Sequence, residues 1–151
     1  TYNLGSSSYK FATLYATTFS GTATQAQYAD LAECYAGDTD YEPGTVVDFG
    51  GECEITISSI DSSPYIAGVV STNPAHLMNS AIDADYPVAV ALAGRVPCKV
   101  TGPVCKGQMM VSAGNGRARA ESKPTIGSVI GKALENNTDG ENVIEIVVGR
   151  L

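Results

Sequence analysis

The stretch VAVALA at Val88–Ala93 is the longest uninterrupted apolar run in the chain. Along an extended strand, its valines and leucine point to one face and its alanines to the other. We predict a strand that is buried on both faces, with another element packed close over the small alanine side chains. The run is also far shorter than the ~20 apolar residues that a bilayer-spanning helix requires, so the sequence predicts no membrane insertion.

Further apolar and β-branched runs lie on both sides of this strand, and turn signals rich in Gly and Asn separate them. The other predicted strands cover residues 45–49, 54–60, 65–71, 96–101, 108–112, 126–134 and 143–148. The best helix candidate, QAQYADLAECY at 25–35, is short. Short strands at regular spacing therefore predict an all-β fold, a compact β-sandwich or barrel that occupies residues 29–151.

Residues 1–28 differ from the rest because they are rich in Ser, Thr, Ala and Gly and hold little to form a core. Between Tyr9 and Phe19 the aromatic residues occupy alternate positions, so an extended strand would place them on one face. Such a strand is an aggregation hazard in a monomer. We predict that residues from about Tyr2 to Phe19 form an extended β arm that pairs with a neighbouring subunit. The assembly contact is assigned to Tyr9, Phe11, Leu14, Tyr15 and Phe19. An ordinary first strand of the same domain is the alternative.

Charge is unevenly distributed along the 151 residues. The net charge of -7 and a pI near 4.5 argue against non-specific nucleic-acid binding. Residues 11–94 contain eleven acidic residues and no Lys or Arg, whereas residues 95–123 hold a single acid, Glu121. The basic residues of that second region are Arg95, Lys99, Lys106, Arg117, Arg119 and Lys123. This pattern predicts a molecule with an acidic and a basic face that stacks head to tail, the alternative being a solvated surface of mixed sign.

Four cysteines allow three pairings, and none of them belongs to a C-x-x-C pair. With a single histidine in the chain, a zinc site is disfavoured and two disulfides in an oxidising compartment are predicted. The turn signal at 101–103 lies between Cys98 and Cys105, so a hairpin there would bring these two together. That pairing leaves Cys34 with Cys53.

Residues typical of catalysis are scarce, and we predict a non-enzymatic protein without catalytic residues or cofactor. The only histidine, His76, lies in an Asn-Pro turn, and no Gly-rich phosphate loop is present. The alternating acids Asp38, Asp40 and Glu42 could offer carboxylates to Ca²⁺, although they lack EF-hand spacing. Asn136 begins an N-x-T glycosylation sequon.

Several strings together carry a resemblance to a known family. The run NLGSSSYKFATLYATTFSG at 3–21 resembles the segment that precedes the terminal domain in tailed-phage fibre proteins. Seven further strings resemble the terminal β domain of those proteins. They are YADLAE (28–33), YEPGTVV (41–47), AGVVSTNP (67–74), VALAGRVPCKV (90–100), GPV (102–104), IGKALE (130–135) and VVGRL (147–151). The similarity covers nearly the whole chain in order, which makes it more specific than any single motif.

This resemblance implies a structural subunit of an extracellular fibre. This subunit could take two forms. One is the distal domain of a phage tail fibre, typically a trimer, and the other is a free-standing subunit that polymerises through its N-terminal strand. The implied partners are copies of the chain itself, as a homopolymer or homotrimer, and a host-surface receptor. Cys34, Cys53 and Cys105 depart from the usual fibre pattern and suggest covalent locking outside a cell.

Two alternatives remain open at this point. The YADLAE and VSTNP strings are also similar to a phage appendage domain family linked to autoproteolysis and intramolecular chaperoning, but no catalytic set of that family matches residues here, and the S-D-x-x-x-K motif of another fibre chaperone family is absent. The other alternative is a receptor- or glycan-binding tip, for which Tyr35, Tyr41, Tyr65 and Tyr86 are the candidates.

Overall fold

The computed structural model describes residues 4–13, 15 and 29–149. Within these residues the protein is all β, with ten strands and no helix. The strands are β1 (Asp30–Ala36), β2 (Val46–Phe49), β3 (Ile55–Ile57), β4 (Ile66–Val70), β5 (His76–Met78), β6 (Pro87–Thr101), β7 (Met109–Gly114), β8 (Arg117–Glu121), β9 (Val129–Ala133) and β10 (Glu141–Val148). The all-β prediction is therefore confirmed. The described part of the chain contains no helix that is long and apolar enough to cross a bilayer.

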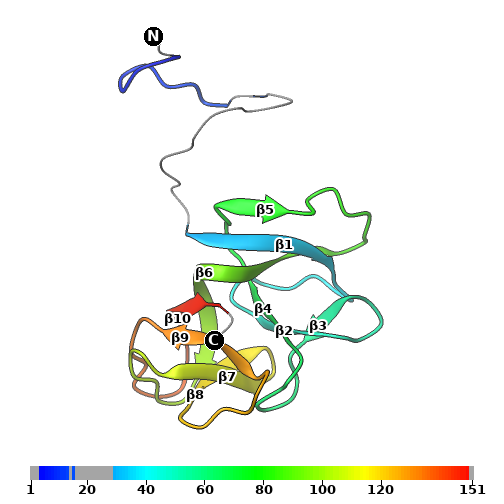
Figure 1. Cartoon of the computed structure of the whole chain (residues 1–151), viewed down its shortest axis with the longest axis vertical. Coiled ribbons are helices and arrows are strands. Elements are labelled where there is room, and N and C mark those ends of the chain that lie inside the picture. The colour runs from blue at the N-terminus through cyan, green and yellow to red at the C-terminus, as the bar shows by residue number, and fades with distance from the viewer. Residues whose placement is uncertain (1–3, 14, 16–28, 150–151) are drawn as a thin grey trace.

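Five of the strands close into a mixed barrel (Figure 1). Antiparallel pairing links β6 to β10, β10 to β9, β9 to β7 and β7 to β8. Strand β8 in turn pairs in parallel with β6 at Val100↔Ala118, and this pairing closes the barrel. The other strands pack outside: β1 and β4 pair with the first part of β6, β2 and β3 continue from β4, and β5 pairs in parallel with β1.

Strand β6 connects the outer strands to the barrel because it belongs to both. The two strands predicted at 88–93 and 96–101 form one continuous strand of 15 residues. Its valines alternate, so that Val88 and Val90 enter a core between the outer strands and Val96 and Val100 enter the barrel core. Burial on both faces was predicted for the first half of β6. On the alanine face this holds only for Ala91, and the prediction is wrong for Ala89 and Ala93. The reason is that β1 and β4 lie beside β6 and leave its alanine face partly open.

A bulge bends β6 between its two halves. The β1–β6 register passes from Ala32↔Ala91 to Leu31↔Ala93, which leaves Leu92 without an opposite residue. Gly94 follows with φ of 105°, and a Cβ there would lie 2.1 Å from the carbonyl oxygen of Ala29. Only glycine fits this conformation and this approach, so the Gly94 position fixes the bend.

Two apolar clusters stabilise the described β domain. The larger fills the barrel and includes the fully buried Met110 and Ile146. The smaller lies among the outer strands around Val47 and Ile55, with Tyr41 packed against it. Neither cluster contains a described residue of the N-terminal arm, so the β domain buries its core without those residues.

The described part of the arm, residues 4–13, forms no strand. The backbone N–H of Ser6 donates to the carbonyl oxygen of Tyr9 at 2.9 Å, and the N–H of Tyr9 donates to the Ser6 hydroxyl at 3.1 Å. This local turn occupies part of the segment predicted to extend, and the pairing of that segment with a neighbouring subunit stays a prediction. Two of the five predicted contact residues, Leu14 and Phe19, lie outside the described residues.

Candidate assembly site

An apolar groove opens where β6 bends. The last pair between β4 and β6 is Val69↔Ala91, and β10 joins β6 from Gly94 onward. Leu92 lies between these two pairings, so β4 and the ends of β9 and β10 diverge from it. The resulting hollow measures about 230 Å³, and its lining includes Ile66 of β4 and Ile130 of β9.

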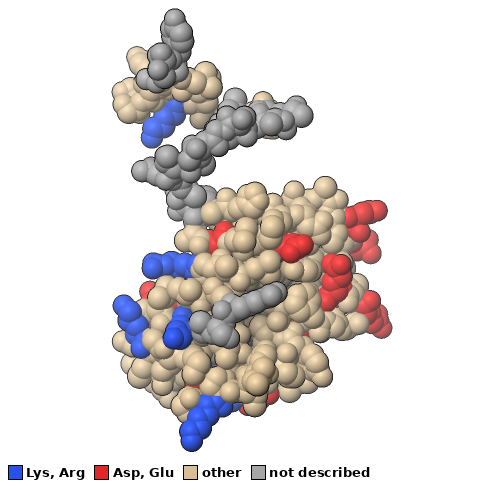
Figure 2. Space-filling model, viewed as in Figure 1, with Lys and Arg blue, Asp and Glu red and all other residues tan. Residues whose placement is uncertain are grey.

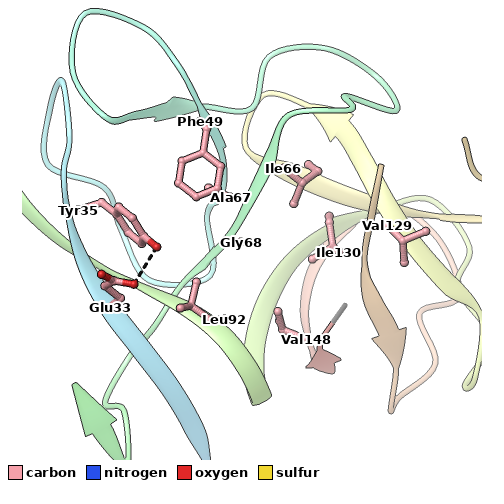
Figure 3. Close-up of a pocket in the computed structure, with 11 residues that line it drawn as sticks. Glu33, Tyr35, Phe49, Ile66, Ala67, Gly68, Leu92, Val129, Ile130 and Val148 are labelled. Atoms are coloured by element: carbon pink, nitrogen blue, oxygen red, sulfur yellow. Dashed lines mark hydrogen bonds between the residues drawn. The ribbon is translucent and has the colours of Figure 1, made fainter. Parts of the chain in front are cut away.

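Strands β1 and β2 supply the wall with aromatic side chains. Figure 3 shows Tyr35 and Phe49 on the same side of the hollow, facing Ile66 and Val148 across it. The two rings meet edge to face, with centroids 5.4 Å apart and an interplanar angle of 77°. The Tyr35 hydroxyl donates to the Glu33 carboxylate at 2.9 Å. Phe49 is 47% exposed, so the wall presents apolar surface to solvent.

A second hollow of about 430 Å³ continues the first, because Ile66 and Val129 line both. Its other lining residues include Met109 and Ile126, whose side chain is fully exposed. We refer to the two hollows together as the groove. Among the described residues that line it, Glu33 is the only charged one.

The chemistry of this lining suits binding more than bond breaking. The described lining residues include no His, Cys, Lys or Arg, so they hold no pair of nucleophile and base. Apolar and aromatic side chains dominate, with one carboxylate and one phenol on the wall. Such a surface can accept ring side chains from another chain and one positive charge.

The three described aromatic residues of the arm are exposed. Tyr9 is 81% exposed, Phe11 61% and Tyr15 94%. Leu4 is exposed as well. Within the described residues, the arm thus presents exposed rings and the β domain presents an apolar groove.

Four of the six predicted basic residues lie on strands β6 and β8, and each of these four pairs with a carboxylate of the same chain. Arg95 pairs with Glu145 at 3.4 Å, Lys99 with Glu42 at 2.7 Å, and Arg117 with Glu141 at 2.6 Å. In Figure 2, acidic side chains gather on the right side of the molecule and basic ones on the left and at the bottom. The acidic and basic regions are thus partly separated in this view, and head-to-tail stacking stays a prediction.

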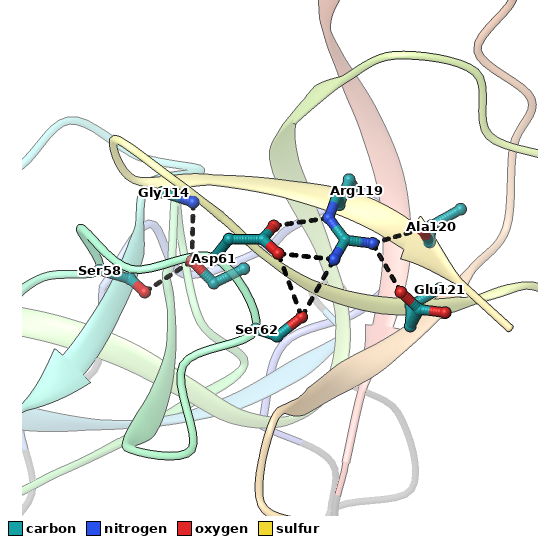
Figure 4. Close-up of polar contacts among 8 residues, drawn as sticks. Ser58, Asp61, Ser62, Gly114, Arg119, Ala120 and Glu121 are labelled. Atoms are coloured by element: carbon teal, nitrogen blue, oxygen red, sulfur yellow. Dashed lines mark hydrogen bonds and ion pairs between the residues drawn. The ribbon is translucent and has the colours of Figure 1, made fainter. Parts of the chain in front are cut away.

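Arg119 is the most heavily engaged of these basic residues (Figure 4). Its guanidinium contacts Asp61 on one side and Glu121, at 2.9 Å, on the other. The hydrogen bond from Arg119 holds the pKa of Asp61 below its usual value. Lys106 and Lys123 form no ion pair within the described residues.

The two predicted disulfides are corrected, because all four cysteines are free. The hairpin expected between Cys98 and Cys105 does not form: after Thr101 the chain leaves β6, and Val104 pairs with Asn137 instead. Cys98 is fully buried in the barrel, where desolvation raises the pKa of its thiol to about 12, while Cys105 is exposed.

The predicted pair of Cys34 with Cys53 is absent as well. Cys34 is buried on β1, and burial followed by the nearby Glu33 charge raises the pKa of its thiol. Cys53 lies exposed in the bend between β2 and β3. Each predicted pair therefore consists of one buried and one exposed cysteine.

The remaining sequence candidates lie apart from the groove. Asp38 accepts hydrogen bonds from Tyr41 and Thr56, and Glu42 pairs with Lys99, so two of the three proposed calcium ligands have protein partners. No group of three or more potential metal ligands occurs in the described part of the chain. The glycosylation candidate Asn136 is exposed, and so are His76 and the recognition candidates Tyr65 and Tyr86.

Sequence reasoning did not find the groove. Its β4 and β9 residues fall in predicted strands, Glu33 and Tyr35 fall in the helix candidate at 25–35, and Tyr35 was named only as a candidate for receptor or glycan binding. Nothing in the alternation of these segments shows that two strands diverge at Leu92. The one usable signal was Gly94, which interrupts an otherwise regular strand pattern, since an isolated glycine in a strand often marks a bulge.

No protein-family model and no curated protein matches the chain. Among solved structures, the chain is similar to the head fiber gp8.5 N base of bacteriophage phi29. The two share a TM-score of 0.45 and 14% sequence identity, over 78% of this chain and 92% of that chain.

Proposed function

We propose that this protein is a non-enzymatic structural subunit that assembles through its N-terminal arm into an extracellular fibre or filament. The observation that carries the proposal is the contrast between the arm and the β domain. The rings of Tyr9, Phe11 and Tyr15 are exposed, while the β domain buries two apolar clusters of its own. A partner surface that covers these rings would remove the exposed apolar area.

The free energy of burying the aromatic side chains of the arm supports association through a small number of residues. Burial of each large aromatic side chain contributes roughly 1.5–3 kcal/mol. Part of this gain is offset by ordering the arm and by lost translational and rotational freedom. The backbone hydrogen bonds of an added strand would contribute further to the gain from three or more buried rings.

Copies of the same chain are the proposed partners. The sequence resemblance to tailed-phage fibre proteins, which build their fibres from copies of one chain, supports this assignment and an extracellular or virion location. The partial separation of acidic and basic side chains supports a head-to-tail orientation, in which opposite charges steer the approach of two subunits (Figure 2).

Negative-stain microscopy of the purified full chain tests the proposal, because it separates filaments, trimers and monomers. The Phe11→Asp variant should lose the assembled form, since burying an unpaired charge costs ~2 kcal/mol or more, a factor of roughly 30 in association. Ser8→Asp is the matched control, because it adds the same charge to the arm outside the aromatic face, and it should assemble. A full chain that stays monomeric at every concentration would contradict the proposal.

A further inference from the structure

We infer that the groove between β4 and β9 is the acceptor for the arm of a second copy of this chain, with Lys10 of the arm paired to Glu33 of the groove. The inference rests on the proposed function, since it names the surface to which the assembling arm binds. Both partners are then present in every subunit, so each copy would donate one arm and accept one.

The shape and the lining of the groove match the aromatic residues of the arm. A cavity of about 150 Å³ is large enough to hold a benzene molecule. The hollows of about 230 and 430 Å³ therefore have room for ring side chains. Same-face residues of a strand are ~6.6–6.8 Å apart, so Tyr9 and Phe11 can reach successive parts of one continuous groove.

Strand edges beside the groove leave backbone groups for an added strand. On the side of β4 that faces β6, pairing begins only at Val69, so Ile66 and Ala67 have no register partner there among the described residues. On β9, the described pairing with β10 covers positions 131–133, and the position opposite Val129 lies outside the described residues. An arm strand in the groove could hydrogen-bond to the β4 edge.

Charge points to the arm as the occupant. Lys10 is the only charged residue among positions 1–29, and Glu33 is the only charged residue among the described residues that line the groove. Glu33 is half-buried and forms no ion pair with any described residue. The flexible stem of Lys10 allows its ammonium to reach this carboxylate while the neighbouring rings lie on the apolar lining.

The arm of the same chain is the competing occupant. In the single chain, however, Tyr9, Phe11 and Tyr15 remain exposed, and Phe49 and Ile126 of the groove remain exposed as well. The described arm residues thus leave their own groove uncovered. We therefore assign the groove to the arm of a second copy.

A charge swap in the full chain tests the inference. Lys10→Glu and Glu33→Lys should each slow assembly at least tenfold, measured by light scattering and confirmed by sedimentation, and the double variant should recover most of the wild-type rate. Lys123→Glu and Glu52→Lys are the matched controls, because they make the same charge changes outside the arm and the groove. Far-UV circular dichroism of each variant verifies that the β domain is folded.

Mixing the two single variants distinguishes a neighbour's arm from the chain's own. In an equimolar mixture, each arm of one variant meets a groove of the other, and every contact again joins one cation to one anion. The mixture should therefore assemble much faster than either variant alone. A double variant that recovers while the mixture does not would assign the groove to the chain's own arm and overturn the inference.

The remaining outcomes separate this inference from the proposed function. If both single variants assemble at the wild-type rate, the Lys10–Glu33 contact is wrong, while assembly of the wild-type chain leaves the proposed function standing. If the wild-type chain forms no oligomer at all, the proposed function fails and the inference fails with it.

Discussion

Arg119 and Asp61 form a two-point ion pair, with Nε 2.6 Å from Oδ1 and Nη2 2.8 Å from Oδ2. The pair joins barrel strand β8 to the segment between β3 and β4. Because β4 begins only a few residues later, at Ile66, the ion pair helps to hold the outer strands against the barrel and so to hold one edge of the groove in place.

We expect Arg119→Ala to lower the free energy of unfolding by about 1 kcal/mol, because two-point Arg–carboxylate pairs are stronger than ordinary surface pairs but both side chains remain partly exposed. For a chain of this size the melting temperature should fall by ~2–4 °C. Lys123→Ala is the control, since Lys123 forms no ion pair within the described residues. Equal melting temperatures for the two variants would show that the Arg119 contacts contribute nothing.

Stability should fall in acid. Hydrogen bonds from Tyr41 to Asp38, and from Arg119 to Asp61, lower the pKa of each carboxyl below its usual value. A carboxyl whose pKa is lowered in the folded state contributes stability at pH values above its unfolded pKa, and this contribution is lost as the pH falls through the folded pKa. Thermal melts should therefore vary little from neutral pH down to about pH 5 and shift to lower temperature below about pH 4.

The variant Asp61→Asn sharpens this test, because it removes one of the lowered carboxyls. Its melting temperature should be reduced at pH 7, and the further drop on acidification should be smaller than in the wild-type chain. A wild-type melting temperature that is the same at pH 3 and pH 7 would contradict the assignment.

Thiol reactivity should divide the cysteines into two pairs. Cys53 and Cys105 are exposed, whereas burial raises the pKa of Cys34 and brings that of Cys98 to about 12. At pH 8 an aromatic disulfide reagent should label two thiols rapidly in the folded protein and the other two only in denaturant, because the thiolate is the reactive form. Reductant should leave the melting temperature unchanged.

The variants Cys53→Ser and Cys105→Ser should each remove one fast-reacting thiol. The variant Cys34→Ser should leave the fast phase intact and reduce only the total number of thiols that are labelled in denaturant. A folded wild-type protein in which no thiol reacts, before or after unfolding without reductant, would restore the two disulfides predicted from the sequence.

The bend of β6 should tolerate no side chain at Gly94. Alanine there would place its Cβ 2.1 Å from the Ala29 carbonyl oxygen, at a φ of 105°. We expect Gly94→Ala to destabilise the protein by ~2 kcal/mol or more, through backbone strain and the displacement of β1. Gly149→Ala is the control, because its Cβ would meet nothing within 4 Å. Similar unfolding midpoints in urea for both variants would show that the bend does not depend on glycine.

The sequence predicted the strands with apolar alternation and missed those without it. Three predicted segments have β-branched side chains on the buried face, and each contains a strand of the structure. They are residues 45–49 with β2, 65–71 with β4 and 143–148 with β10. In β1 the buried positions hold the small or polar Asp30, Ala32 and Cys34, while Leu31 points outward, so its pattern favours no strand. In β8 alanines alternate with arginines, which leaves too little apolar signal.

Long-range geometry explains the other errors. The hairpin predicted between Cys98 and Cys105 followed from a local turn signal, but β6 pairs with β10 through eight successive positions, and this pairing decides where the chain goes after Thr101. The groove depends likewise on which strands diverge at Leu92, and local periodicity carries no information on strand order. The assembly role of the arm was predicted from composition and alternation alone, and it stays a prediction.

Sedimentation velocity of the chain lacking residues 1–20 tests the central claim most directly. Both apolar clusters consist of residues from the β domain, so the truncated chain should remain folded and soluble, with the circular dichroism of a β protein. The account predicts that it sediments as a monomer at concentrations where the full chain forms fibres or oligomers. A truncated chain that is folded and still assembles would contradict assembly through the arm, and one that unfolds would show the arm to be a core strand of its own domain.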